Sequence, residues 1–244
     1  MTVLRLIVDF DGVVVDALDE CALVTWLGLH PPAPSEPVSA AMTVMPTEFR
    51  RRFARVRDFS RTLHHFVVAH RAAAGHIASQ AEFDNLYAAI TPATVRDFVA
   101  RASASRQRCR EEEAPFWLDL HTLYPGVADL LERHAGSVAI VTAKDEESVW
   151  TILRRRGLEH TVVEVVGESS RKDEAVRALC QRFGLTPPQV TFIDDNLSNV
   201  CQVSGTGAGA RWATWGYHTP EDRAAAGRSG VRPLDLADLP TITV

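Results

Sequence analysis

The sequence predicts an α/β fold, a doubly wound parallel sheet interrupted by an inserted all-helical domain, from three observations. An apolar run over residues 3–8 stops at two carboxylates, Asp9 and Asp11. Strand-like and helix-like segments alternate from Tyr124 onward. Between them, residues 17–119 show helical spacing and few strand-like alternations. We therefore expect the helical domain to follow the first strand of the sheet directly.

Composition limits the kinds of protein that this chain can be. The 244 residues are 46% hydrophobic and 23% charged, which allows a sizeable core in one domain that carries an insertion. A net charge of -5 argues against a nucleic-acid or anionic-membrane partner. No apolar run approaches the roughly 20 residues that span a bilayer, so no membrane segment is expected.

The cysteines and the N-terminal segment bear on the compartment. Four scattered cysteines fit neither a disulfide framework nor a zinc site, which favours reduced thiols in the cytosol. The acidic pair that begins at Asp9 argues against a signal peptide. We expect a cytoplasmic protein, either a monomer or a homodimer.

Helical periodicity organises the insertion. It predicts helices over residues 17–29, 80–90 and 91–113, and the proline-rich residues 30–37 end the first of them. Another helix is predicted to begin at Pro46 and to stop at Gly75, because large apolar residues recur at helical spacing between these two positions.

The second half of the chain predicts the rest of the sheet. Buried strands are expected over residues 137–143, 161–167, 190–195 and 210–216. Helices are expected over residues 125–136, 145–157 and 172–184. Such alternation implies parallel strands joined by right-handed crossovers. The residues after Trp215 receive no assignment.

Polar residues of a consistent kind follow these strands. Because burying charge is costly, Asp9 and Asp11 should lie at the open carboxyl end of the first strand, although a polar turn without function would also explain them. In a parallel sheet all such strand ends meet at one edge, where ligands bind. Phosphoryl transfer uses carboxylates that bind Mg²⁺, together with a hydroxyl group and an ammonium group that bind the phosphoryl oxygens. The residues at this edge are Asp9, Asp11, Thr142, Lys172, Asp194, Asp195 and Asn199.

Four segments resemble the motifs of the haloacid dehalogenase (HAD) superfamily, in the subgroup with a helical cap inserted after the first motif. They are DFDGVVVDA, YPGVADLLERHAGSVAIVTAKDE, GESSRKDEAVRALC and VTFIDDNLSN. The resemblance implies a Rossmann-like HAD core of residues 1–16 and 120–244 and a cap of residues 17–119. The cap matches only in its length and helical character, and it is expected to close over the substrate.

The resemblance also implies roles for the matching residues. Asp9 resembles the nucleophile that forms an aspartyl-phosphate, and Asp11 resembles the general acid and base. Gly12, Thr142, Ala143 and Lys172 are the expected phosphate-binding residues.

A Mg²⁺ cofactor is implied as well. Its expected ligands are Asp195, a side-chain oxygen of Asp9 and the backbone carbonyl of Asp11. Asp194 is expected to be either a ligand or a residue that orients the ligands, and Asn199 to orient them.

The acid at position 11 indicates the reaction, because family dehalogenases and phosphonate-cleaving members lack it. The resemblance therefore implies a phosphatase that acts on a small phosphomonoester, namely a sugar phosphate, a phospho-acid or a nucleoside monophosphate. Two alternatives remain: a phosphomutase of the β-phosphoglucomutase type, and a phospho-metabolite sensor without turnover.

Six arginines of the insertion allow two interpretations. In one they form a solvated helix face, and in the other one or two of them bind a carboxylate or a second phosphate of the substrate. These arginines are Arg50, Arg51, Arg52, Arg55, Arg57 and Arg61.

Overall fold

The computed structural model describes residues 4–33 and 35–242. It divides into two compact units. The helical unit is Ala17–His121, and the remainder of the described chain forms the sheet unit. Val3, which the apolar pattern placed in the first strand, lies outside the described residues.

A six-stranded parallel sheet organises the described part of the sheet unit, in the order β5-β4-β1-β6-β7-β8. This topology confirms the predicted doubly wound α/β fold. The central strand β1 is buried on both faces, which explains its purely apolar sequence. The strands are β1 Leu6–Val8, β4 Val138–Val141, β5 Val162–Val166, β6 Thr191–Asp194, β7 Gly209–Ala213 and β8 Arg232–Leu234.

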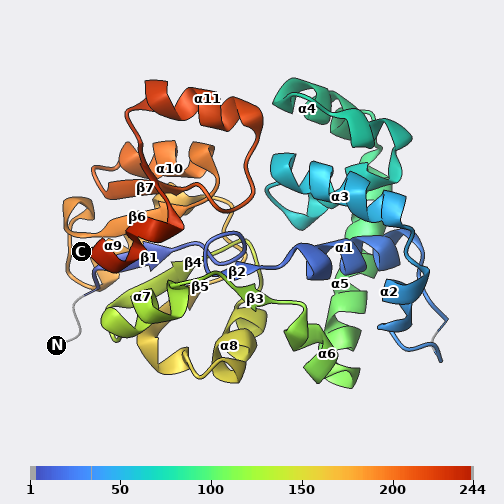
Figure 1. Cartoon of the computed structure of the whole chain (residues 1–244), viewed down its shortest axis with the longest axis horizontal. Coiled ribbons are helices and arrows are strands. Elements are labelled where there is room, and N and C mark those ends of the chain that lie inside the picture. The colour runs from blue at the N-terminus through green and yellow to red at the C-terminus, as the bar shows by residue number, and fades with distance from the viewer. Residues whose placement is uncertain (1–3, 34, 243–244) are drawn as a thin grey trace. The chain divides into compact units, whose positions relative to one another are not determined.

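Helices cover both faces of this sheet (Figure 1). Figure 1 shows α7 and α8 on one side of the sheet and α10 and α11 on the other. Apolar residues of α9 and α10, among them Val176 and Val203, share a core cluster with Ile7 of β1 and Phe192 of β6. The helices are α7 Val127–Arg133, α8 Glu146–Arg155, α9 Lys172–Arg182, α10 Leu197–Ser204 and α11 Pro220–Ser229, with short 3-10 turns η3 Glu159–Thr161, η4 Pro187–Gln189 and η5 Leu236–Thr241.

A small antiparallel pair of strands carries the chain out of the sheet unit and back into it. β2 Val15–Asp16 precedes the helical unit, and β3 Thr122–Leu123 follows it. Asp16 pairs with Thr122, so the two chain crossings lie side by side. The single-segment helical insertion after the first strand is thereby confirmed.

The described residues of the helical unit form helices and turns without a strand. Its core is aromatic, with Phe53, Phe83 and Phe98 fully buried. These rings come from different helices, so their burial holds the unit together. The helices are α1 Leu18–Leu29, α2 Ala40–Val44, α3 Thr47–Phe59, α4 Gln80–Ala88, α5 Pro92–Glu112 and α6 Ala114–Asp119, with 3-10 helices η1 Leu63–His70 and η2 Ala72–His76.

The predicted long helix from Pro46 to Gly75 is wrong in its second half. α3 begins as expected but ends at Phe59, where Ser60 turns to an extended conformation with ψ of 141°. The Ser60 hydroxyl donates to the carbonyl of Val56 at 2.8 Å, a bond that competes with the helix ladder. Beyond it the apolar residues lie on two 3-10 helices, so helical spacing alone concealed the break.

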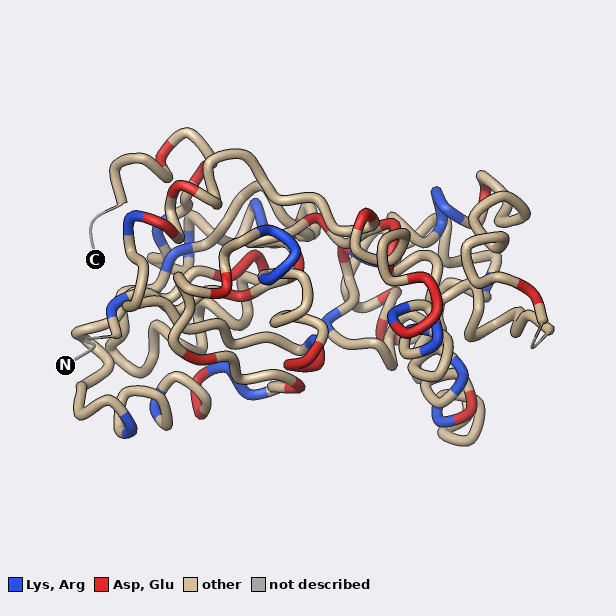
Figure 2. Tube along the Cα trace, turned by 90° about the horizontal axis from the view of Figure 1, so that it is seen from below, with Lys and Arg blue, Asp and Glu red and all other residues tan. Residues whose placement is uncertain are grey.

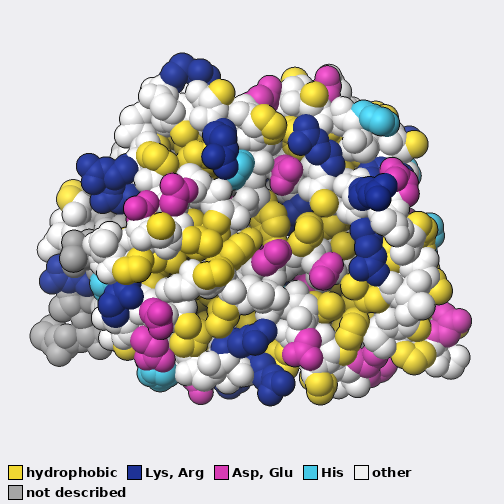
Figure 3. Space-filling model, in the orientation of Figure 1, with side chains coloured by type: hydrophobic (Ala, Val, Ile, Leu, Met, Phe, Trp, Pro, Cys, Tyr) yellow, Lys and Arg dark blue, Asp and Glu magenta, His cyan; other side chains and the backbone are white. Residues whose placement is uncertain are grey.

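The surface carries charge of both signs. Figure 2 shows basic and acidic residues interspersed along the trace of both units, and the face in Figure 3 shows them scattered among apolar side chains. No helix within the described ranges combines the length and the apolar character needed to cross a membrane.

Candidate active site

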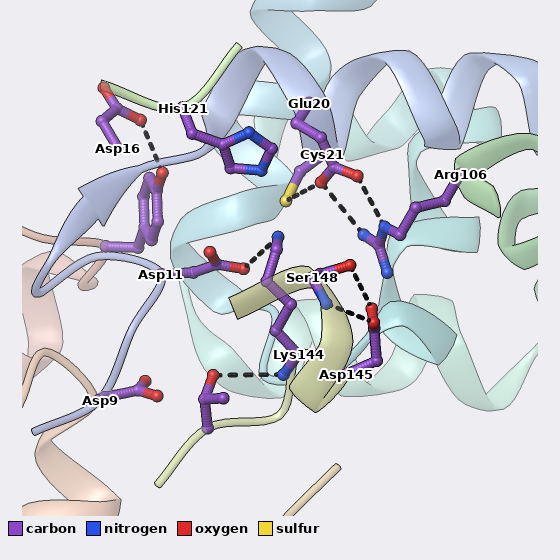
Figure 4. Close-up of polar contacts among 12 residues, drawn as sticks. Asp9, Asp11, Asp16, Glu20, Cys21, Arg106, His121, Lys144, Asp145 and Ser148 are labelled. Carbon is purple, nitrogen blue, oxygen red and sulfur yellow. Dashed lines mark hydrogen bonds and ion pairs between the residues drawn. The ribbon is translucent and has the colours of Figure 1, made fainter. Parts of the chain in front are cut away.

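The sequence-predicted site residues of the sheet unit gather at the carboxyl ends of its strands. Asp9 and Asp11 follow β1, Thr142 follows β4, and Asp194 ends β6. Because Val8 lies beside both Ile140 and Ile193, the residues after these three strands meet at one edge. Figure 4 shows the carboxylates of Asp9 and Asp11 emerging from the loop that follows β1.

Three carboxylates form a cluster at this edge. Oxygens of Asp9, Asp194 and Asp195 lie within 4.8 Å of one another. Asp194 is fully buried, and this burial, followed by the negative charge of Asp9, raises its pKa to about 7. A cation beside these oxygens would offset both effects.

Nearby donors orient Asp194. Its Oδ1 accepts the backbone N–H of Asn196 at 2.7 Å, and its Oδ2 accepts the amide of Asn199 at 3.0 Å. The Asn196 side chain in turn caps α10, which begins one residue later. The start of α10 therefore sets the position of this carboxylate.

Asp195 is held by β7 and by the segment that follows it. Its Oδ2 accepts the backbone N–H of Tyr217 at 2.6 Å, and its carbonyl accepts the indole N–H of Trp212 at 2.8 Å. Gly12 leaves room for it: a Cβ at Gly12 would lie 2.0 Å from Asp195 Oδ2, and its φ of 94° favours glycine. The role of Gly12 in binding phosphate stays a prediction, and in the structure this residue lies against the Asp195 carboxylate.

Lys172 is a buried cation of the site, with 3% of its surface exposed. Its ammonium lies 2.8 Å from Asp9 Oδ1 and also donates to the carbonyl of Val141, the last residue of β4. Lys172 is the first residue of α9, where the sequence predicted that helix to begin. It therefore places one positive charge between two strand ends.

The strongest omission of the sequence analysis is Lys144. Its buried ammonium lies 3.1 Å from Asp11 Oδ2 (Figure 4). The other oxygen of Asp11, Oδ1, is buried and has no hydrogen-bond partner within the described residues. The sequence did carry a signal, because Lys144 stands two residues after Thr142 at the same strand end.

Thr142 and Ala143 begin the loop that carries Lys144. Thr142 is buried, and its hydroxyl accepts the backbone N–H of Lys144 at 3.2 Å. The Thr142 carbonyl accepts the N–H of Ser169, which ties this loop to the one before α9. Ala143 is exposed beside them. The loop thus brings a hydroxyl group and a lysine to the carboxylate edge.

The carboxylate cluster suits a hard divalent cation. Its donors are carboxylate oxygens from three residues, of the kind that Mg²⁺ prefers. The buried, mutually repelling charges of Asp9 and Asp194 supply a physical reason for a cation there. The residues present therefore fit the expected cofactor.

Comparison with known families identifies the family to which this chain belongs. A family model described as haloacid dehalogenase-like hydrolase matches residues 5–200. The chain belongs to this family. The match includes β1 and the residues after β4 and β6, and it confirms the resemblance seen in the sequence motifs and the expectation of a hydrolase.

Individual relatives of this HAD hydrolase are phosphatases. A phosphoglycolate phosphatase from Pasteurella multocida is 30% identical over 108 residues, 41% of this chain and 48% of that protein. Another from Aliivibrio fischeri is 31% identical over 110 residues, 42% of this chain and 48% of that protein. The matches span about half the length of these curated relatives.

Solved structures show the same fold over the whole chain. A protein described as a predicted phosphoglycolate phosphatase from Haemophilus somnus 129pt has a TM-score of 0.65 and 23% identity, covering 100% of this chain and 99% of that chain. A HAD-like hydrolase from Streptococcus pneumoniae has a TM-score of 0.62 and 16% identity, covering 98% of both chains. At these identities the likeness establishes the fold alone.

Proposed function

We propose that this HAD hydrolase is a Mg²⁺-dependent phosphatase that cleaves a small phosphomonoester through an aspartyl-phosphate on Asp9. The observation that carries the proposal is the cluster of Asp9, Asp194 and Asp195 with the ammonium of Lys172 on Asp9. A carboxylate nucleophile, a cation site and a fixed positive charge are what phosphoryl transfer to a carboxylate requires.

Asp9 is the proposed nucleophile. Lys172 holds its Oδ1 at 2.8 Å, which fixes the carboxylate plane and leaves Oδ2 to attack phosphorus. The new O–P bond forms as the bond to the substrate oxygen breaks, giving an acyl phosphate on Asp9. Water then attacks this phosphorus, releases inorganic phosphate and restores the carboxylate.

Asp11 is the proposed general acid and base. Lys144 engages Oδ2, so the unpartnered Oδ1 is the oxygen that would carry the proton. That proton passes to the departing substrate oxygen in the first step. The same oxygen then accepts a proton from the attacking water in the second step, which regenerates the acid.

The surrounding residues would stabilise the charge that develops on the phosphoryl oxygens. Lys172 supplies a buried positive charge, and Thr142 supplies a hydroxyl group beside it at the strand ends. Asp9, Asp194, Asp195 and the Asp11 carbonyl would hold Mg²⁺, which neutralises negative charge on the phosphate when it is bound.

Phosphoglycolate is the first substrate to test, because the curated relatives named above are phosphoglycolate phosphatases. Sugar phosphates and nucleoside monophosphates complete the panel. The substrate choice rests on these relatives and not on any contact in the helical unit.

The decisive experiment measures inorganic phosphate released from this panel, with Mg²⁺ and with EDTA, using Asp9→Asn as the blank. We expect release from one compound class that stops with EDTA and in the blank. Absence of release from a folded protein that binds Mg²⁺ would overturn the phosphatase. Isomerised sugar phosphate without free phosphate would indicate the phosphomutase instead.

A further inference from the structure

One short segment, Trp212–Tyr217, comprises the end of β7 and the residues that follow it. It contacts both the proposed cation site and the strand pair that leads into the helical unit. At one end it holds Asp195, through the indole of Trp212 and the backbone N–H of Tyr217. At the other end, the phenol of Tyr217 donates to Asp16 Oδ1 at 2.7 Å. Asp16 ends β2, immediately before the first residue of the helical unit.

The fit around this segment is close. A Cβ at Gly216 would lie 2.2 Å from the carbonyl of Gly12 and 2.4 Å from Asp195 Cβ. A Cβ at Gly12 would lie 2.9 Å from the ring of Tyr217. Trp215 donates to the carbonyl of Val13 at 3.2 Å, in the turn between β1 and β2. Because these parts interlock, a displacement of Asp195 is transmitted to the turn and to the Tyr217 ring.

We propose that Tyr217 is a positioning residue that couples the metal-binding carboxylate Asp195 to β2, the strand through which the chain enters the helical unit. The inference rests on the proposed Mg²⁺ site. Its backbone N–H orients one oxygen of Asp195, a carboxylate of the candidate cation cluster. Its phenol fixes Asp16, so an Asp195 ordered by the cation also orders β2 and its partner β3.

The two bonds of Tyr217 can be separated by mutation. Tyr217→Phe removes the bond to Asp16 but keeps the backbone N–H on Asp195, so Mg²⁺ affinity should stay within about twofold of the native value. Asp16→Ala removes the same bond from the other side. Gly216→Ala, in contrast, displaces Asp195 and should weaken Mg²⁺ binding about tenfold or more.

The test combines Mg²⁺ titration calorimetry with amide hydrogen exchange of the full chain. In the native protein, Mg²⁺ should slow exchange in β2 and β3 by about fivefold or more. In Tyr217→Phe and in Asp16→Ala, Mg²⁺ should still bind, and this slowing should be lost. If the bond between Tyr217 and Asp16 carries the coupling, the double variant should lose no more of the slowing than Tyr217→Phe alone.

Two matched control variants separate the loss of the Tyr217–Asp16 bond from a general effect of substitution. Gly227→Ala, on α11, introduces a Cβ with nothing within 4 Å and should leave Mg²⁺ affinity and exchange unchanged. Tyr87→Phe removes a phenol from the helical unit and should leave the slowing intact. Circular dichroism and thermal unfolding verify that each variant is folded.

Several results would overturn the coupling. One is that Mg²⁺ slows hydrogen exchange in β2 and β3 equally in Tyr217→Phe and in the native protein. Another is that Mg²⁺ does not slow this exchange in the native protein. The third is that Tyr217→Phe no longer binds Mg²⁺. None of these measurements needs a substrate. A failure to release phosphate would therefore reject the proposed phosphatase while leaving the coupling to be judged by exchange and calorimetry alone.

Discussion

The two units hold buried charge in opposite ways. In the helical unit, the fully buried Glu20 accepts two bonds from the guanidinium of Arg106, at 2.6 and 3.1 Å, and a weaker one from the indole of Trp117. In the sheet unit, Asp11 keeps one buried oxygen without a partner among the described residues, close to a cluster of three further carboxylates.

This difference separates charge that stabilises a fold from charge that is available for chemistry. The two oxygens of Glu20 accept from the side chains of Arg106, Trp117 and Cys21, so little lone-pair capacity remains there for a ligand. A carboxylate with an unused buried oxygen carries a cost in stability, and such costs gather at functional sites. The comparison predicts that changes at the sheet edge alter turnover, whereas changes in the helical unit alter stability.

The largest expected effect is that of Asp9→Asn. Loss of the nucleophile should lower kcat by about 10⁴-fold or more, because the aspartyl-phosphate cannot form. The melting temperature should change little, because relief of the repulsion with Asp194 offsets loss of the ion pair with Lys172. Steady-state kinetics and thermal unfolding measure both. Asp97→Asn, an exposed change on α5, is the control, and residual turnover above one per cent would contradict the assignment.

The next effect is that of Lys172→Met. Without this cation, kcat/KM should fall about 10²- to 10³-fold, because a buried charge no longer faces the transferring phosphoryl group. Stability in EDTA should also fall, because Asp9 loses its partner. Arg177→Met, an exposed change on the same helix, controls for the helix itself. Native kcat/KM in Lys172→Met would place the phosphate elsewhere.

Metal removal should change how stability depends on pH. Burial raises the pKa of Asp194 to about 7 in the folded protein, above its value of 3.8 in the unfolded chain. The folded state therefore binds this proton more tightly, and stability in EDTA should fall as pH rises from about 4 to about 7 and then level off. Mg²⁺ should flatten this slope because it stabilises the ionised carboxylate.

Guanidinium chloride unfolding between pH 4 and pH 8, with Mg²⁺ and with EDTA, measures this dependence. Asp194→Asn should remove the part of the slope that depends on the metal. A slope that is the same with Mg²⁺ and with EDTA would mean that Asp194 lies outside the cation site.

The smallest expected effect concerns the arginines of α3. Arg52 donates to the carbonyl of Ala69 at 2.7 Å, and Arg55 donates to that of Ile77 at 2.6 Å, so both fasten the 3-10 segments to α3. Arg52→Gln and Arg55→Gln should each lower the free energy of unfolding by about 1 kcal/mol and leave KM unchanged. Arg51→Gln, at an exposed position, is the control. A tenfold rise in KM without a loss of stability would favour a substrate-binding role.

The sequence predicted the sheet well because the relevant signals are local. β1, β4 and β6 are short apolar runs that end in polar residues, and parallel strands necessarily bring those ends together. Asp9, Asp194 and Lys172 could therefore be named from their spacing and from the family motifs. Lys144 could not be paired with Asp11, because that contact depends on side-chain packing between two loops.

Two other features lay beyond the reach of periodicity. The break at Ser60 depends on one hydroxyl that bonds a carbonyl within the helix, and the apolar spacing continues past it. Tyr217 follows a strand whose end carries no charged residue, so nothing in its sequence marks it as a neighbour of Asp195. Its position follows from the close approach of Gly12 and Gly216.

The pairing of β2 with β3 also bears on how such a chain could be rebuilt. The two ends of the helical unit leave the sheet unit at the paired residues Asp16 and Thr122, whose Cα atoms lie about 5 Å apart in an antiparallel ladder. A linker of a few residues could bridge that gap, and another helical insert could be spliced between the same two positions. The paired strands β2 and β3 therefore allow the inserted domain to be exchanged without a change in the strand order of the sheet.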